Sequence, residues 1–153
     1  MLVKDAMSAE VISIREDVPL NRAAQVLCEE RISGAPVVND NGELVGMLSQ
    51  ADLLPKLKGV PFAKIELPTL VGEWYDAAEF ESAVRAAGNR TVGEVMTKRP
   101  ITIESEETIA SAAELLSRAN IKRLPVTRNG QLVGIITRSD IVRLFLKAVE
   151  ALD

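Results

Sequence analysis

Internal repetition constrains the fold of this chain more than any other feature of its sequence. The segment Val3–Met7 aligns with Val92–Met96, which lies 89 residues later. One extra residue in the first copy then reduces the offset to 88, so that residues 42–46 align with residues 130–134. A match that spans most of each half and needs one insertion does not arise by chance. The chain therefore contains two copies of one unit.

Each copy predicts the element order β-α-β-β-α. Apolar residues in the first copy recur at helical spacing at Leu20, Ala23, Ala24 and Leu27, which indicates one buried helix face. Asn129-Gly130 in the second copy is a strong hairpin signal, because both residues tolerate a positive φ. The expected first strands are 11–14 and 101–103, the hairpin strands are 35–38, 44–49, 124–127 and 132–137, and the closing helices are 51–57 and 139–149. The predicted fold class is α/β, in an α+β arrangement.

The repeats divide the chain into three expected parts. Residues 1–57 form the first repeat, residues 58–90 form a linker with a helix at 74–87, and residues 91–153 form the second repeat. One copy of about 50 residues is marginal as an independent fold. The two copies are therefore expected to pack through their sheets as a pseudo-twofold pair.

Composition excludes several classes of function. The 153 residues include no histidine and one cysteine, Cys28, so transition-metal sites, catalytic triads and internal disulfides are excluded. Cys28 lies beside the apolar helix face and is expected to pack there. The net charge of −4 and the absence of a basic stripe argue against nucleic acid as a partner. No apolar run approaches the ~20 residues of a membrane span. We expect a cytoplasmic protein that is not an enzyme and requires no metal.

The best candidate binding residues lie where the last strand of each copy meets its last helix. Residues 46–52 and 134–140 both have the pattern G-h-h-[ST]-x-x-D, where h is apolar. The glycine leaves space for a flat group, the hydroxyl lies at a helix N-terminus that favours an anion, and the aspartate can accept two hydrogen bonds from a ribose diol. The same spacing is also that of a simple helix cap. Its occurrence at the same point of both copies favours a ligand site.

These motifs resemble the cystathionine β-synthase (CBS) domain pair, also called the Bateman module. The resemblance includes the duplication, the hairpin and a [GR]-h-P-V element at residues 34–37 and 123–126. It implies two β-α-β-β-α units paired through their sheets, with an adenosyl compound bound in the cleft between the repeats. It also implies a homodimer.

The resemblance supplies a set of ligand-binding residues. It implies aspartates on the ribose, hydroxyls on the phosphate side, polar residues of the first strands beside the adenine, and backbone segments that bracket the base. In that order these are Asp52 and Asp140; Ser49 and Thr137; Ser13 and Thr102; and Ala35, Pro36, Leu124 and Pro125.

Three cations distinguish the second copy. Lys122, Arg123 and Arg138 occupy positions where the first copy has Ser33, Gly34 and Gln50. Cations grouped at one end of the expected cleft would bind phosphate groups. Arg123 is the strongest candidate, because an arginine there resembles phosphate-contacting members of the family. Solvated surface charge is the alternative for Lys122 and Arg138.

The predicted function is therefore a regulatory module that senses an adenine nucleotide. The expected ligand is AMP, ADP or ATP, with S-adenosylmethionine ranked below these, and no cofactor is required. Binding would modulate a separate target protein that the sequence does not identify. The alternative is a dimerisation or protein-interaction module that binds no small ligand. The two hypotheses differ in whether the aspartates of the repeated pattern contact anything outside the chain.

Overall fold

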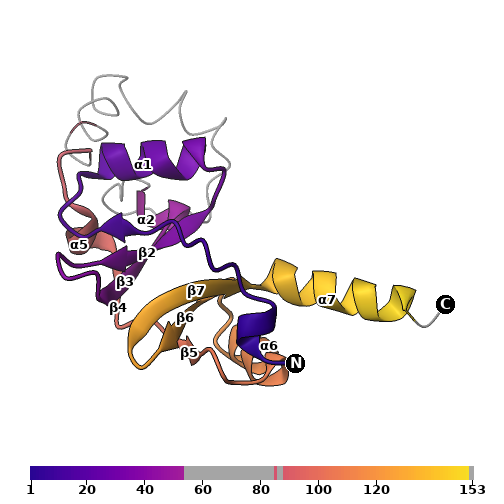
Figure 1. Cartoon of the computed structure of the whole chain (residues 1–153). Coiled ribbons are helices and arrows are strands. Elements are labelled where there is room, and N and C mark those ends of the chain that lie inside the picture. Colours follow the sequence, from indigo (N-terminus) through magenta and orange to yellow (C-terminus); the bar gives the residue numbers. More distant parts are fainter. Residues whose placement is uncertain (54–84, 86–87, 152–153) are drawn as a thin grey trace, which may run out of the picture. The chain divides into compact units, whose positions relative to one another are not determined.

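The computed structural model describes residues 1–53, 85 and 88–151 (Figure 1). The expected linker helix at 74–87 and most of the linker lie outside the described residues. The described residues belong to two compact units, which are treated separately below. One unit contains residues 1–13, 38–45 and 99–151, and the other contains residues 14–37 and the described part of 46–98.

The first sheet has four strands in the order β1-β2-β3-β4 (Figure 1). The strands are β1 (Ile14–Arg15), β2 (Gly34–Val38), β3 (Leu44–Ser49) and β4 (Thr97–Lys98), and the helices of this repeat and its neighbouring segment are α1 (Leu20–Glu29), α2 (Gln50–Leu53) and α5 (Val92–Val95). The predicted apolar face of α1 is confirmed, because Leu20, Ala23 and Leu27 are buried. The prolyl residue before Leu20 is the N-cap, where its missing N–H costs no helix hydrogen bond.

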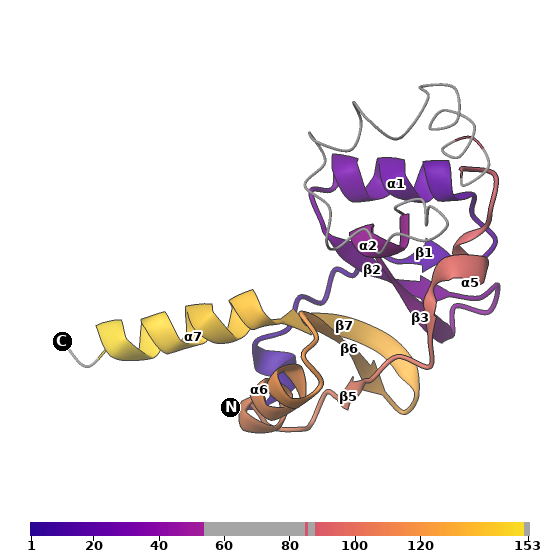
Figure 2. The ribbon, with the colours of Figure 1, turned by 180° about the vertical axis from the view of Figure 1, so that it is seen from behind.

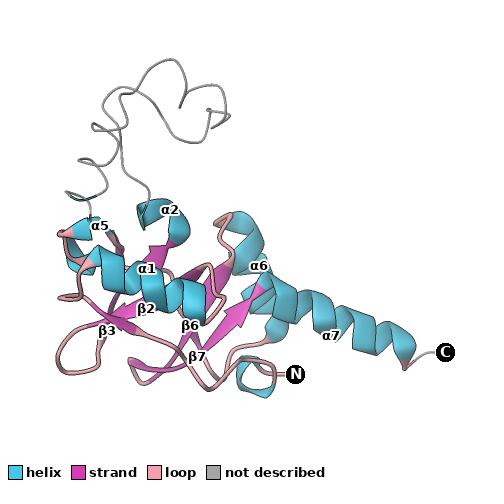
Figure 3. Cartoon of the chain, turned by 90° about the horizontal axis from the view of Figure 1, so that it is seen from above, coloured by secondary structure: helices cyan, strands magenta, loops and turns pink. Residues whose placement is uncertain are grey.

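The second sheet has three strands in the order β5-β6-β7. The elements of this unit are β5 (Ile103–Glu104), α6 (Ile109–Arg118), β6 (Arg123–Arg128), β7 (Gln131–Thr137) and α7 (Arg138–Glu150). Strand β5 runs parallel to β6, and β6 runs antiparallel to β7. The predicted hairpin is confirmed, because Asn129 and Gly130 connect β6 to β7 with φ values of 51° and 79°. Both repeats have the predicted order β-α-β-β-α, as β1-α1-β2-β3-α2 and β5-α6-β6-β7-α7; Figure 3 colours the helices cyan and the strands magenta.

The first strands and Cys28 differ from the expectation. Strands β1 and β5 contain two residues each and begin at Ile14 and Ile103, so the predicted ranges 11–14 and 101–103 were wrong in their bounds. Ile12 is 36% exposed and Ile101 is 45% exposed, because the chain joins its sheet only after them. Cys28 is exposed as well, since it lies one position beyond the buried stripe of α1. The closing helix of the second copy is confirmed, whereas residues 54–57 of the first lie outside the described residues.

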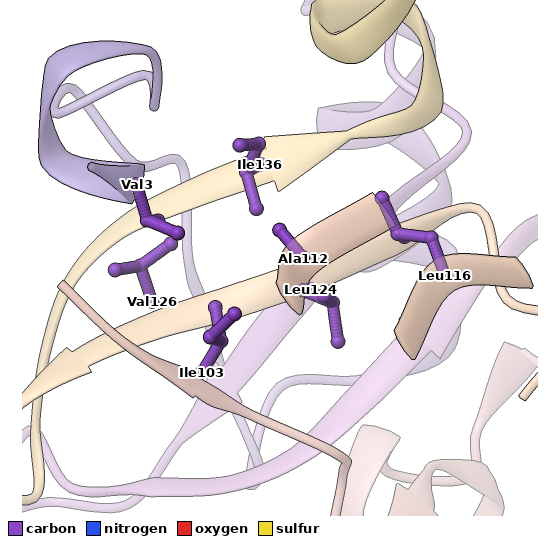
Figure 4. Packing of buried hydrophobic residues seen from close by; sticks show 7 residues of the cluster. All are labelled: Val3, Ile103, Ala112, Leu116, Leu124, Val126 and Ile136. Atoms are coloured by element: carbon purple, nitrogen blue, oxygen red, sulfur yellow. The ribbon is translucent and has the colours of Figure 1, made fainter. Parts of the chain in front are cut away.

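The hydrophobic core beneath strands β5, β6 and β7 includes a residue from the N-terminal end of the sequence. Figure 4 shows its seven buried side chains, which are Val3, Ile103, Ala112, Leu116, Leu124, Val126 and Ile136. Val3 belongs to the short 3-10 helix η1 (Val3–Asp5), which precedes the first repeat's strands. The N-terminal segment is therefore part of the same hydrophobic core as the second repeat.

The segment at the start of the second repeat packs against the first repeat in the same way. The Val3 N–H donates to the Glu107 carbonyl oxygen at 2.8 Å, and the Val92 N–H donates to the Val18 carbonyl oxygen at 2.9 Å. These two bonds are equivalent under the repeat. Strand β4 likewise pairs with β3, while Ser8 forms the equivalent bridge with a residue of β7. Each repeat thus contributes its leading segment to the sheet of the other, and the compact units do not follow the repeat boundaries in the sequence.

The helices of the described residues are short. The longest, α7, contains 13 residues. Within the described ranges, no helix has both the length and the apolar character needed to cross a bilayer.

Candidate functional site

The junction of β7 and α7 holds the carboxylate of Asp140 in one position. Its Oδ2 atom accepts hydrogen bonds from the Thr137 N–H and from the Thr137 hydroxyl, both at 2.7 Å. In return, the Asp140 N–H donates to the Thr137 Oγ1 atom at 3.3 Å, which completes a capping box. Asp140 is 9% exposed and is the buried acid of this helix. The helix cap therefore holds the carboxylate in one position.

The second oxygen of this carboxylate contacts a residue that sequence reasoning missed. Asp140 Oδ1 accepts a hydrogen bond from Arg143 Nη2 at 2.7 Å. The Arg143 side chain is 67% exposed, whereas that of Asp140 is 11% exposed. The available signal was the i,i+3 spacing of an acid and a base on one helix, which makes them neighbours.

The first copy repeats the capping geometry. Asp52 Oδ2 accepts from the Ser49 N–H at 2.8 Å and from the Ser49 hydroxyl at 2.9 Å. Both residues are half-buried. The capping box is complete in the second copy, and the first copy has the two equivalent bonds to its aspartate. A ligand role for the two aspartates stays a prediction.

Strand register brings Arg123 beside the capping box. Arg123 of β6 is the cross-strand partner of Thr137, and the next pair is Leu124 with Ile136. Leu124 and Ile136 both belong to the buried core. Because successive side chains of a strand alternate between faces, Arg123 and Thr137 share the opposite face of the sheet. The [GR]-h-P-V element and the G-h-h-[ST]-x-x-D pattern, which are separate in the sequence, therefore lie side by side in the sheet.

Partial burial changes the electrostatics of Arg123. The guanidinium is half-buried, and this desolvation lowers the pKa of Arg123 below its ordinary value. Arginine nevertheless stays protonated at neutral pH in proteins. A cation that has already lost part of its water offers a stronger interaction to an arriving anion than a fully solvated one does.

The segments predicted to bracket a base are buried. Leu124 and Ala35 are fully buried, and so are the prolines that follow them, Pro125 and Pro36. These residues pack inside the protein with almost no accessible surface, backbone atoms included. Their role in binding stays a prediction.

The predicted polar residues of the first strands lie just outside those strands. Thr102 precedes β5, and since Ile103 is in register with Val126, Thr102 lies at the level of Pro125. Ser13 immediately precedes β1 in the same way. Both residues are exposed.

A cavity of about 480 Å³ lies beside Thr102, on the side of α6. Its wall carries the carboxylates of Glu104, Glu107 and Glu114 and one cation, Arg118, which is paired with Glu114, whereas Arg123 and Asp140 do not line it. Acidic walls repel phosphate. This cavity is therefore a poor candidate for the predicted nucleotide site.

The glycines of the repeated pattern do not leave space for a flat group, which corrects that expectation. A Cβ atom built on Gly134 would collide with the Met7 sulfur, and one built on Gly46 would collide with the Met96 sulfur. Met7 and Met96 are equivalent under the repeat and come from the exchanged leading segments. The glycines accommodate these methionines, so a long-range packing partner and not a ligand explains them.

Arg138 makes a structural contact. Its Nη2 atom donates to the Leu116 carbonyl oxygen and to Asn120 Oδ1, both at 3.1 Å. Leu116 lies in the last turn of α6, and its carbonyl oxygen also accepts a hydrogen bond from the Ile121 N–H at 3.2 Å. Arg138 therefore ties the end of α6 to the start of α7. Its predicted phosphate contact stays a prediction.

Comparison with known families identifies the two sequence repeats. The CBS domain model matches residues 3–59 and 92–147. An uncharacterised protein of Methanocaldococcus jannaschii is 34% identical over 157 residues, which cover 95% of this chain and 92% of the relative. The chloroplastic CBS domain-containing protein CBSX2 of Arabidopsis thaliana is 30% identical over 138 residues, or 88% of this chain and 58% of that protein.

Solved structures extend the comparison. The crystal structure of CBSX2 in complex with AMP superposes with a TM-score of 0.70 at 27% identity, covering 96% of this chain and 97% of that one. The CBS domain pair of protein MJ0100, crystallised with 5′-methylthioadenosine and S-adenosyl-L-methionine, gives a TM-score of 0.69 at 26% identity and covers 97% of this chain and 98% of that one. The fold, the duplication and the family model agree, and this chain belongs to the CBS domain family as a tandem pair.

Proposed function

We propose that this chain is a regulatory module that binds an adenine nucleotide at its second repeat and thereby alters a separate target protein. The single observation that carries the proposal is the register that sets Arg123 opposite Thr137, next to the fixed carboxylate of Asp140. A cation and an anionic hydrogen-bond acceptor at one point suit the phosphate and the ribose of one nucleotide. The adenosyl ligands of the two related crystal structures support this choice of ligand class.

The hydrogen bonds of the site assign a different role to each residue. The Asp140 carboxylate accepts the ribose hydroxyls through Oδ1, whose present partner Arg143 is exposed and can move aside. The single hydroxyl proton of Thr137 is already donated to Asp140, so Thr137 positions the carboxylate. Arg123 then pairs with the phosphate. Thr102, which is exposed at the level of the buried Pro125, contacts the base.

The first repeat has the equivalent acid but a different surrounding. Asp52 is held by Ser49 as Asp140 is held by Thr137, yet Ser33, Gly34 and Gln50 replace the three cations. Without these three cations, this repeat prefers an adenosyl ligand with less negative charge, contacted by Ser13 beside the buried Ala35 and Pro36. The two repeats therefore differ in ligand preference.

Regulation follows if the nucleotide binds two conformations of the module with different affinity, because only differential binding shifts a population. The target protein responds to that shift. The absence of histidine from the sequence removes the commonest general base, which supports a role other than catalysis. The lone cysteine suits a reducing compartment, so we place the protein in the cytoplasm.

Isothermal titration calorimetry with AMP, ADP, ATP, adenosine and S-adenosylmethionine tests the proposal. Asp140→Asn is the informative variant, because an amide oxygen preserves the acceptor of the cap but removes the carboxylate charge and one acceptor oxygen. We expect a roughly tenfold or greater loss of AMP affinity, the size of one charged hydrogen bond. Glu114→Gln, an exposed acid of the same unit, is the matched control and should change nothing. Equal affinities in Asp140→Asn and the wild type would refute the site.

An interaction module without a small ligand is the second candidate. One observation favours it: the caps of Ser49–Asp52 and Thr137–Asp140 account for the repeated pattern without any ligand. This function predicts no heat with any adenosyl compound at millimolar concentration. It also predicts that Asp140→Asn leaves binding to the target protein unchanged.

A further inference from the structure

Arg143 is an exposed cation that contacts the carboxylate of the proposed site. It lies in the second turn of α7, the helix that extends from the end of β7 away from α6 and the sheet (Figure 2). Its Nη2 atom donates to Asp140 Oδ1 at 2.7 Å. The Arg143 side chain is 67% exposed and that of Asp140 is 11% exposed, so the cation can leave for solvent while the acid cannot follow it.

Most of the acceptor sites of the Asp140 carboxylate are in use. A carboxylate has about four such sites, two on each oxygen. The Thr137 N–H and the Thr137 hydroxyl fill the two sites of Oδ2, and Arg143 fills one of the two on Oδ1. Within the described part of the chain, one acceptor site of Oδ1 is therefore left while Arg143 stays in contact.

A ribose needs more acceptor sites than this. Its two neighbouring hydroxyl groups each donate one hydrogen bond, so the second bond to Oδ1 forms only when Arg143 leaves. The Thr137 bonds belong to the helix cap and stay in place. We propose that Arg143 competes with the ribose for Asp140 Oδ1 and thereby determines how strongly the second repeat distinguishes a ribose from a deoxyribose. This inference rests on the proposed function, because it concerns the same carboxylate.

The sequence of the first repeat lacks this competitor at the equivalent position. Asp52 is the counterpart of Asp140, and three positions after it the chain has Pro55 where the second repeat has Arg143. A proline side chain has no hydrogen-bond donor, so it cannot form the contact that Arg143 forms. Ser49 nevertheless donates the equivalent two hydrogen bonds to Asp52. The competition is therefore a property of the second repeat.

The strength of the pair between Arg143 and Asp140 sets the size of the effect. Ion pairs between two exposed groups are weak, whereas hydrogen bonds to charged groups that are shielded from water are stronger. With one exposed partner and one nearly buried partner, this pair lies between the two cases. Its displacement should reduce the affinity for a ribose about three- to tenfold. A bound diol can therefore break the pair.

Calorimetry with adenosine, 2′-deoxyadenosine and 3′-deoxyadenosine tests the competition, because these ligands carry no charge. Arg143→Met removes the guanidinium and keeps a long, unbranched side chain. It should tighten adenosine binding about three- to tenfold and change the affinity for either deoxyadenosine less than about twofold, since a single hydroxyl uses the site that is already open. Circular dichroism verifies that each variant is folded.

Arg118→Met is the matched control. It also removes an exposed arginine that is paired with an acid of its own helix, Glu114, and it changes the net charge by the same amount. It should leave the affinity for all three ligands unchanged.

Two further measurements assign the effect to Asp140. In a chain that already carries Asp140→Asn, Arg143→Met should give no gain in adenosine affinity, because the acid for which it competes is gone. Raising the salt concentration from about 0.05 M to about 0.5 M should tighten adenosine binding to the wild type but not to Arg143→Met, because salt screens the ion pair and adenosine is neutral.

The outcomes separate this inference from the proposed function. A gain confined to adenosine supports the competition. Equal adenosine affinities in Arg143→Met and the wild type overturn it and leave the nucleotide site in place. Equal gains for adenosine and both deoxyadenosines also overturn it, because Arg143 would then obstruct the whole ligand. Weaker adenosine binding would make Arg143 a ligand contact. Absence of binding by every adenosyl compound, to the wild type and to the variants, refutes the proposed function and this inference with it.

Discussion

The two repeats share a scaffold but differ in the side chains that surround it. In both, a hydroxyl residue at the end of the last strand caps the following helix through an aspartate three residues later. Only the second repeat sets an arginine, Arg123, opposite that hydroxyl residue, and only its aspartate has a described arginine partner, Arg143. Duplication has preserved the groups that hold the acid in place, whereas the groups that would select a ligand have diverged. Within one chain, the residues that position the aspartate are thus distinct from the residues that would determine ligand specificity.

The glycines of the two repeats provide the largest test of this comparison. Gly46→Ala should destabilise the protein by about 2–3 kcal/mol and Gly134→Ala by about 1 kcal/mol, within the range for an overfilled core. The reason for the difference is that a Cβ atom on Gly46 meets the Thr97 carbonyl oxygen at 2.9 Å as well as Met96, whereas the one on Gly134 meets Met7, a flexible side chain. Urea denaturation of both variants measures the difference.

A matched pair of variants checks the cause. If Met7 is the obstacle, Gly134→Ala combined with Met7→Ala should be less destabilised than the sum of the two single variants. Strict additivity would mean that the methionine does not fill the space beside Gly134.

Arg123 sharpens the comparison at the level of the ligand. Arg123→Gln should weaken AMP binding roughly tenfold and leave adenosine binding unchanged, because a charged hydrogen bond to phosphate is lost and no contact with the nucleoside is. Calorimetry with both ligands measures the two constants. A parallel loss of AMP and adenosine affinity would instead assign Arg123 to the general structure of the site.

Arg138 gives the smallest expected effect. Arg138→Gln introduces the residue found at the equivalent position of the first repeat, Gln50. The change removes the hydrogen bonds to the Leu116 carbonyl oxygen and to Asn120. We expect a loss of about 1 kcal/mol in the free energy of unfolding, with AMP affinity unchanged. Thermal unfolding and calorimetry measure these quantities. Weaker AMP binding at unchanged stability would instead indicate that Arg138 contacts the phosphate.

The fold was predictable where the signal is local or repeated. The stripe of α1, the hairpin at Asn129-Gly130 and helix α7 all follow from spacing and turn chemistry, and the duplication doubled each signal. The capping role of the aspartates was also visible, because a hydroxyl residue and an acid three positions apart have that role in many helices. In each case the residues that decide the structure are near one another in the sequence.

The features that were missed depend on distant partners. Gly46 and Gly134 suggested space for a ligand because their partners, Met96 and Met7, lie 50 or more residues away in the sequence. Cys28 was misplaced by one position on its helix, which is enough to turn a side chain from the core to solvent. The meeting of Arg123 with Thr137 required the strand register, which composition and spacing leave open.

The reciprocal placement of the leading segments limits how this protein can be divided. A cut within residues 58–90 would leave one fragment that carries Val3 but lacks the core it packs into, and another that carries Val92 but lacks the strands beside it. Neither fragment would be a self-sufficient folding domain. Mixing them should regenerate the native assembly by complementation, so that the repeat, although it is the unit of gene duplication, is not the unit of folding.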